Sequence, residues 1–337
     1  MKRVNLALQG GGSHGAYAWG ALDAILEDER LEIEGISGAS AGAMNAVVMA
    51  SGLLDGRDEA REKLTKFWRG VALEGGPGAT IPVVDAWVSM WKAMFAPASV
   101  ADAAAQASTP YAFNPFNINP LRDTLAALVD FEKLREGHGP KLFVAATNVR
   151  TGKGEVFRRD VLTPDHVMAS ATLPHLFQAV VIDGEPYWDG GYSGNPPLWP
   201  LFYETDCCDA IIVQINPIAR EGVPETPVAI SNRIDEITFN ASLLAELRAA
   251  DFVARLIEEG VLDNPRYRLE RLHRIGGDGS LEDFPPSSKF DISWSFLQRL
   301  RDLGRHSAKA WLERHFDAIG KRSTLDIAGA LQKPKAD

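Results

Sequence analysis

The sequence predicts an α/β fold of three layers, in which helices cover both faces of a mostly parallel central sheet. Its first fifty residues follow the order strand, helix, strand, helix, which is typical of a parallel sheet covered by helices. Residues 141–149 and 209–215 are nearly continuous apolar runs, as expected of strands buried on both faces. With 45% apolar and 24% charged residues, a chain of 337 residues can form a sizeable core.

The first strand is expected at residues 4–8, and it leads directly into a cluster of glycines. Residues 15–27 then carry apolar side chains at helical spacing. A second strand at 31–37 runs into the small residues GASAG and a helix that is predicted to be buried. Both strands are therefore expected to pass into their helices through turns of small residues.

Two regions depart from this pattern. Residues 51–138 mix loops rich in glycine and proline with many aromatic and methionine side chains, which predicts a helical insertion outside the sheet. The insertion is either a lid over a site or the core of a small helical subdomain. Residues 221–337 are predicted to form a mainly helical extension with one further strand, packed on a core domain of residues 1–220.

The charge and the cysteines limit the classes of partner. A net charge of -10 argues against nucleic acid, because phosphate binding requires clustered Lys and Arg, and it disfavours simple electrostatic docking to anionic lipid. The neighbours Cys207 and Cys208 are typical of reduced thiols. The sequence contains no run of 18 apolar residues, so we expect no membrane-spanning helix. We expect a cytoplasmic protein and leave open peripheral contact with a membrane surface; no oligomeric state is indicated.

The glycine cluster has three interpretations. Gly10, Gly12 and Gly15 fit G-x-G-x-x-G between a strand and a helix. The backbone N–H groups of such a loop can hold a nucleotide phosphate or a reacting oxyanion, or the glycines can simply allow a tight turn. An NAD(P)-dependent oxidoreductase would also need an acidic residue at the end of the next strand, where this chain has small residues instead.

A serine follows the second predicted strand in the pattern G-x-S-x-G, made by Gly38, Ser40 and Gly42. Between a strand and a helix, this pattern holds the serine on a strained elbow with its hydroxyl group exposed. The N–H group of Ala41 can then donate to an oxyanion. The alternative is an ordinary helix-capping serine in a turn of small residues.

A serine nucleophile needs a base, and Asp189 is the strongest candidate. None of the seven histidines lies in a loop after a late strand, where a hydrolase histidine is expected. Asp189 follows a strand-like segment and precedes Gly190 and Gly191, although this motif alone would be read as a hairpin turn.

The motifs GGGSHG at 10–15, GASAG at 38–42 and DGG at 189–191, with ASATLPHLFQAV at 169–180, together resemble the patatin-like phospholipase family over roughly residues 4–217. The resemblance implies a Ser40–Asp189 dyad without histidine. It also implies an oxyanion hole formed by the N–H groups of Gly10, Gly11 and Gly12, to which that of Ala41 is added. The supporting residues are His14, Gly15, Gly38, Gly42, Gly190 and Gly191. His14 stands where the family often has Arg or Lys, and it could bind an anion in the same way only when protonated.

The resemblance implies a serine acyl hydrolase that acts on lipid esters in the manner of a phospholipase A or lysophospholipase, without cofactor or metal. No clustered acidic ligands of the calcium-loop kind occur. The substrate is left open among phospholipid, lysophospholipid, acylglycerol, thioester and polyester. A non-catalytic lipid-binding protein is a further alternative, against which an intact Ser40–Asp189 pair argues.

Overall fold

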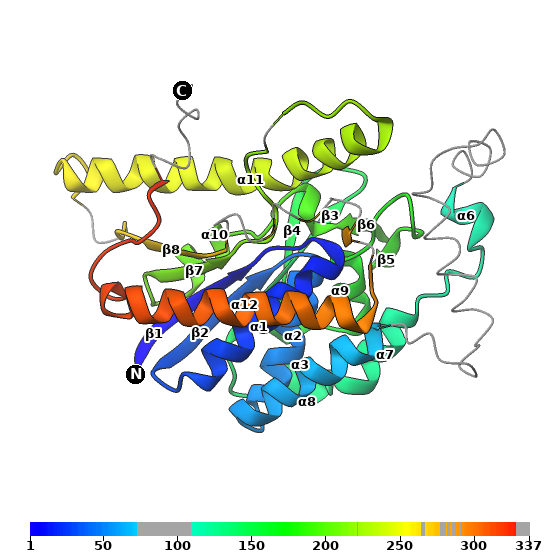
Figure 1. Cartoon of the computed structure of the whole chain (residues 1–337), viewed down its shortest axis with the longest axis horizontal. Helices are drawn as coiled ribbons and strands as arrows, with labels where there is room; N and C mark the ends of the chain where they lie inside the picture. The colour runs from blue at the N-terminus through cyan, green and yellow to red at the C-terminus, as the bar shows by residue number, and fades with distance from the viewer. Residues whose placement is uncertain are drawn as a thin grey trace.

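The computed structural model describes residues 1–72, 109–220, 222–263, 267–276, 281, 284, 288–289 and 291–327. Within these ranges an eight-stranded sheet forms the centre, in the order β5-β6-β3-β2-β1-β7-β8, with β4 also paired to β3 (Figure 1). The parallel strands are β1 (Lys2–Leu8), β2 (Leu31–Gly38), β3 (Lys141–Asn148), β7 (Asp209–Val213) and β8 (Arg271–Ile275). The antiparallel strands are β4 (Gly154–Arg158), β5 (Val180–Ile182) and β6 (Glu185–Asp189). The predicted mostly parallel sheet is confirmed.

Helices cover both faces of the sheet, which confirms the three predicted layers (Figure 1). One layer contains α1 (Gly15–Glu27), α2 (Ala41–Leu53), α3 (Arg57–Val71), α7 (Pro120–Leu128), α8 (Phe131–Glu136), α9 (Pro164–Ser170) and α12 (Trp294–His315). The other contains α10 (Trp199–Glu204) and α11 (Pro227–Glu258). The remaining short helices are α6 (Pro110–Phe113), η1 (Gly12–His14), η2 (Arg159–Val161), η3 (Gly190–Tyr192) and η5 (Phe316–Ala318).

The alternation of side chains along β1 explains the two cores. Leu6 and Leu8 point to the core that contains α1 and α2, whereas Ala7 points to the core formed with α10 and α11. Polar caps begin several helices: the side chain of Asn119 accepts a hydrogen bond at the start of α7, and that of Thr226 accepts one at the start of α11.

Strands β2 and β6 meet end to end along β3. Strand β2 pairs with residues 141–144 of β3, and β6 pairs with residues 146–148. Strand β4 pairs with residues 143–147 and so overlaps both registers. Because a strand has two hydrogen-bonding edges, β2 and β6 share the edge opposite β4. The carboxyl ends of both strands therefore face each other across one residue of β3.

The chain beyond residue 220 is closely joined to the rest. Strand β8 extends the sheet, and α12 packs on α1 so tightly that a Cβ atom on Gly304 would lie 1.9 Å from the carbonyl oxygen of Tyr17. Buried Asp23 of α1 forms ion pairs with Arg61 of α3 and with Arg301 and Arg305 of α12. The predicted boundary at residue 220 stays a prediction.

The predicted insertion at 51–138 is described only in part. Its described residues include α3, α6, α7 and α8, and Leu125 of α7 belongs to the main core. Residues 73–108, which include Trp87, Met90, Trp91, Met94 and Phe95 among the side chains that suggested a lid, lie outside the described residues.

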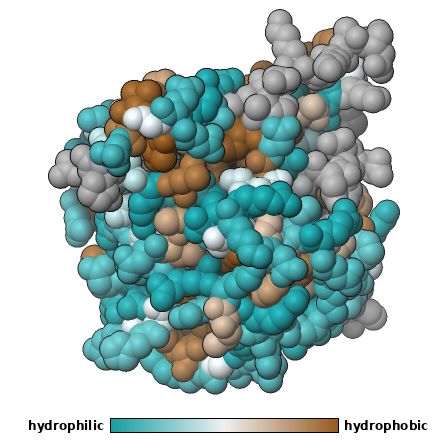
Figure 2. Space-filling model, turned by 90° about the vertical axis from the view of Figure 1, so that its left-hand side faces the viewer, coloured by the Kyte–Doolittle hydropathy of each residue, from teal (hydrophilic) through white to brown (hydrophobic). Residues whose placement is uncertain are grey.

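Figure 2 shows the end of the molecule at which α11 ends; this surface is mainly hydrophilic, and its larger hydrophobic areas lie in the upper half. Near the carboxyl end of α11, the exposed hydrophobic residues include Phe252 and Val261. Among the described residues, no helix combines the length and the hydropathy needed to cross a bilayer.

Candidate active site

Ser40 lies on a strained turn between β2 and α2. Its φ of 55° and ψ of −129° are rare for a residue other than glycine, and its exposed fraction is 8%. The glycines around it are required by close backbone contacts: a Cβ atom would lie 2.7 Å from the Gly42 carbonyl if placed on Gly38, and 2.1 Å from the Leu8 carbonyl if placed on Gly42. The pattern G-x-S-x-G therefore has a steric cause in this fold.

The glycine cluster packs directly against this elbow. A Cβ atom on Gly10 would lie 2.6 Å from the Cβ atom of Ser40, and one on Gly15 would lie 2.6 Å from that of Ala41. Gly12 has a φ of +60°, in the left-handed region that favours glycine. The cluster thus brings its backbone within contact distance of the predicted nucleophile.

The N–H groups of the cluster differ in their hydrogen bonds. That of Gly10 donates to Oδ1 of Asn195 at 2.6 Å. Those of Gly11, Gly12 and Ala41 form no hydrogen bond with another described residue. The N–H groups of Gly11, Gly12 and Ala41 are therefore available to bind a negatively charged oxygen beside Ser40, whereas the Gly10 N–H group already donates to Asn195.

Asp189 ends β6 opposite Ala146 of β3 and is fully buried. Its Oδ1 atom accepts a hydrogen bond of 2.7 Å from the N–H group of Gly191. A Cβ atom on Gly190 would lie 2.1 Å from the carbonyl oxygen of Ala145, so the turn passes closely over β3. Both glycines of the D-G-G motif therefore place the carboxylate.

Burial raises the pKa of Asp189 to about 7, against the hydrogen bonds from Gly191 and the Ser40 hydroxyl, which lower it. The Ser40 hydroxyl is close enough to Asp189 to affect its pKa, but the second carboxylate oxygen, Oδ2, accepts no hydrogen bond of good geometry from the described part of the chain. Such contacts often tighten when substrate binds. A carboxylate with a pKa near 7 beside a serine hydroxyl suits proton transfer at neutral pH.

The end of α9 ties the two residues together. The Ser40 N–H group is 3.0 Å from both the carbonyl oxygen and the hydroxyl of Ser170. The Asp189 N–H group donates to the carbonyl oxygen of Thr172 at 2.8 Å. The sequence analysis included the segment ASAT at 169–172 only as part of the family resemblance and did not predict these contacts.

All seven histidines lie in the described ranges, and none of them hydrogen-bonds to Ser40 or Asp189 there. Burial, together with the charges of Lys289 and Arg220, lowers the pKa of His14 to about 3. Its Nε2 atom is 2.7 Å from the hydroxyl of Ser288. His14 is therefore neutral near pH 7 and gives the glycine loop no positive charge.

A network of buried amide side chains surrounds the loop and was missed by the sequence reasoning. Gln9 accepts hydrogen bonds at its Oε1 atom from the N–H groups of Ile215 and Asn216, and its Nε2 atom donates to Asn240 of α11 at 2.9 Å. Asn195 bonds both the N–H group and the carbonyl oxygen of Gly10. These amides come from four distant segments, so no local motif could have revealed them.

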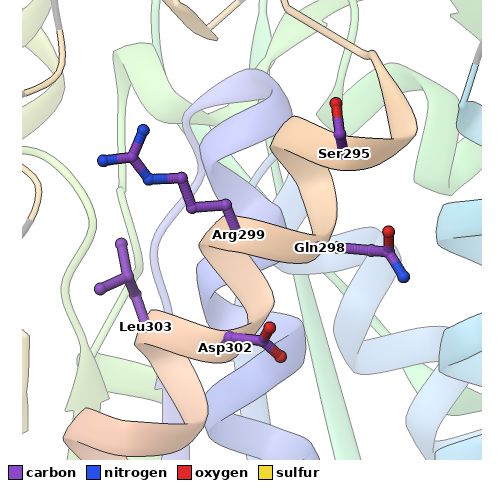
Figure 3. A pocket seen from close by; sticks show the side chains of 5 residues that line it. All are labelled: Ser295, Gln298, Arg299, Asp302 and Leu303. Carbon is purple, nitrogen blue, oxygen red and sulfur yellow. The ribbon is translucent and has the colours of Figure 1, made fainter.

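Two other features carry no site. A shallow pocket on the surface of α12 contains none of the predicted residues, and its side chains point in different directions (Figure 3); they are Ser295, Gln298, Arg299, Asp302 and Leu303. In the described ranges, no group of three or more His, Cys, Asp or Glu side chains is placed to bind a metal ion.

An α/β protein with a strained serine on a strand-to-helix elbow is typical of acyl hydrolases. A family model described as "Patatin-like phospholipase" matches residues 6–202, and the chain belongs to this family. The resemblance stated from the motifs is thereby confirmed, and membership supports lipid ester hydrolysis in general terms.

Among solved structures, VipD from Legionella pneumophila is similar at 16% identity with a TM-score of 0.40, over 93% of this chain and 67% of that chain. No curated protein matches the sequence.

Proposed function

We propose that the protein is a serine hydrolase of lipid esters, of the phospholipase A or lysophospholipase kind, in which Ser40 is the nucleophile and Asp189 its base. The observation that carries the proposal is the convergence of the two residues at the facing ends of β2 and β6, with the pKa of Asp189 raised to about 7. The family membership supports the substrate class.

In this mechanism the Ser40 hydroxyl attacks the ester carbonyl carbon and Asp189 accepts its proton. The alcohol leaves with a proton returned by Asp189, and an acyl-enzyme remains on Ser40. Water, deprotonated by Asp189, then attacks the acyl carbon, the fatty acid is released, and Asp189 returns the proton to the Ser40 oxygen. The absence of a bonded histidine among the described residues supports direct transfer to the carboxylate.

The N–H groups of Gly11, Gly12 and Ala41 are the oxyanion donors in this proposal, because they have no other described acceptor. Gly10 supports them, since its own N–H group is held by Asn195. Removing one such donor typically costs about 3–4 kcal/mol of transition-state stabilisation. A lipid substrate further implies peripheral contact with a membrane or micelle surface.

Labelling with a fluorophosphonate probe, together with hydrolysis of a short p-nitrophenyl ester, tests the proposal. Ser40→Ala should abolish labelling, and both Ser40→Ala and Asp189→Asn should reduce hydrolysis at least about a thousandfold. Exposed Ser295 provides the matched control, and Ser295→Ala should behave as the wild type. Full activity in Asp189→Asn would refute the dyad. Unlabelled, inactive protein would favour a lipid-binding role, and tight binding of NAD would favour the oxidoreductase alternative.

A further inference from the structure

The peptide group between Gly10 and Gly11 is fixed by hydrogen bonds to its carbonyl oxygen. The Gly10 carbonyl oxygen accepts hydrogen bonds from Nδ2 of Asn216 at 2.6 Å and from Nδ2 of Asn195 at 3.4 Å. In a trans peptide the carbonyl and the following N–H group point in opposite directions. Fixing the Gly10 carbonyl therefore fixes the direction of the Gly11 N–H group, one of the proposed oxyanion donors.

Asn216 is in turn oriented by a lysine. Its Oδ1 atom accepts a hydrogen bond of 2.8 Å from Nζ of Lys289, and its own N–H group donates to Gln9 at 2.7 Å. The Oδ1 atom also lies close to the loop, 3.3 Å from a Cβ atom placed on Gly11. The Lys289 ammonium, the Asn216 amide and the Gly10–Gly11 peptide thus form one chain of hydrogen bonds, in which each bond polarises the next.

Lys289 lies against the loop and is partly buried. A Cβ atom on Gly12 would lie 2.6 Å from its carbonyl oxygen. It forms no ion pair with a described residue, and the buried carboxylate of Glu236, whose charge acts on it, pairs with Arg220 at 2.8 Å and with Arg233 at 3.1 Å. Its strongest described contact is therefore the bond to Asn216.

We infer that Lys289, acting through Asn216, is a positioning residue that sets the direction and the strength of the Gly11 N–H group as an oxyanion donor. The inference rests on the proposed function. His14, the one ionisable side chain of the loop at 10–15, is neutral, and of the two cations whose charges act on it, Lys289 and Arg220, Lys289 is the one hydrogen-bonded to Asn216. Lys289 lies outside the range that the family model matches, so the C-terminal part of the chain completes the site.

This arrangement predicts that activity declines at alkaline pH, which gives the pH–activity profile an alkaline limb. Burial lowers the pKa of Lys289 to about 8, with Arg220 acting in the same direction and Glu236 and Asp235 against it. The charged ammonium makes the stronger hydrogen bond to Asn216. Activity should rise as Asp189 ionises through about pH 7, and it should fall as Lys289 loses its proton above about pH 8.

The test compares Lys289→Met, Lys289→Arg and the exposed control Lys153→Met by ester hydrolysis and fluorophosphonate labelling between about pH 6 and pH 10. Lys289→Met should lower kcat and the labelling rate about ten- to a hundredfold with little change in KM, and it should lose the alkaline limb. Lys289→Arg should keep most of the rate and move that limb to higher pH, because a guanidinium stays charged. Unchanged rates and an unchanged alkaline limb in Lys289→Met would overturn the inference.

A second variant separates positioning from folding. Asn216→Asp keeps an oxygen partner for Lys289 but loses the amide N–H that the Gly10 carbonyl accepts, so its rate should fall as in Lys289→Met while the melting temperature stays close to that of the wild type. A rate like that of the wild type would contradict the role of this bond.

Hydrogen exchange of residues 9–12 tests the positioning without any substrate. Exchange should accelerate in Lys289→Met and Asn216→Asp but not in Lys289→Arg. Equal exchange in all variants would refute the inference even if the protein proved not to be a hydrolase. Inactive wild-type protein that shows the expected exchange pattern would instead refute only the proposed function.

Discussion

Asp189→Asn should make the folded protein more stable at alkaline pH although it removes the proposed base. The carboxylate is fully buried and receives one hydrogen bond of good geometry from a described residue, the 2.7 Å bond from Gly191. Burial raises its pKa from 3.8 to about 7. Holding this charge inside the protein therefore opposes folding, and a neutral amide of the same shape removes that cost.

The sign and the magnitude follow from proton linkage. Between pH 4 and pH 7 the folded protein keeps a proton that the unfolded chain releases, so the free energy of unfolding falls as the pH rises through this range. At about 1.4 kcal/mol for each pH unit, the whole effect is about 4 kcal/mol. About 3 kcal/mol of it develops between pH 5 and pH 8.5.

Urea denaturation at pH 5 and at pH 8.5 measures this effect. The free energy of unfolding of Asp189→Asn, relative to the wild type, should increase by about 3 kcal/mol from the lower to the higher pH. Asp160→Asn replaces an exposed carboxylate and should show a much smaller change. A difference between Asp189→Asn and the wild type that is the same at both pH values would refute the reasoning.

Two further substitutions test how the dyad is held. Gly190→Ala would place a Cβ atom 2.1 Å from the Ala145 carbonyl, so it should displace the turn and remove most esterase activity. In the control Gly139→Ala the nearest atom is the end of the Leu54 side chain at 3.2 Å and other neighbours lie at 3.7 Å or more, so it should be tolerated; equal activities would contradict this. Ser170→Ala removes one of two acceptors of the Ser40 N–H group and should lower the melting temperature by an amount equivalent to about 1 kcal/mol, with esterase activity reduced less than in Gly190→Ala; a loss as complete as in Ser40→Ala would show a larger role.

The features that the sequence could predict are those with a local cause, namely the strand-to-helix turn at Ser40 and the strands of the sheet. The pattern around Ser40 is dictated by backbone contacts within a few residues, and strands buried on both faces give continuous apolar runs. The position of β6 on the same edge of β3 as β2 depends on strand register, which no single segment encodes.

The hydrogen-bond partners of the glycine loop could not be predicted for a similar reason. Gly10 reads as an oxyanion donor in the motif, yet its N–H group is taken by Asn195, which is 185 positions away in the chain. Lys289 and Asn216 lie 73 positions apart, and nothing in their local sequence distinguishes them from ordinary polar residues. Both pairings arise only when the chain has folded.

A single residue of β3, Ala145, lies between the part that pairs with β2 and the part that pairs with β6, and this affects how the protein can diverge in evolution. Ala145 separates the pairing of β2 from that of β6, so the spacing between Ser40 and Asp189 is measured along one strand, at about 3.3 Å per residue. The connections between these strands do not enter that spacing. Insertions and deletions in them can change the surface around the site over evolutionary time without altering the spacing between Ser40 and Asp189.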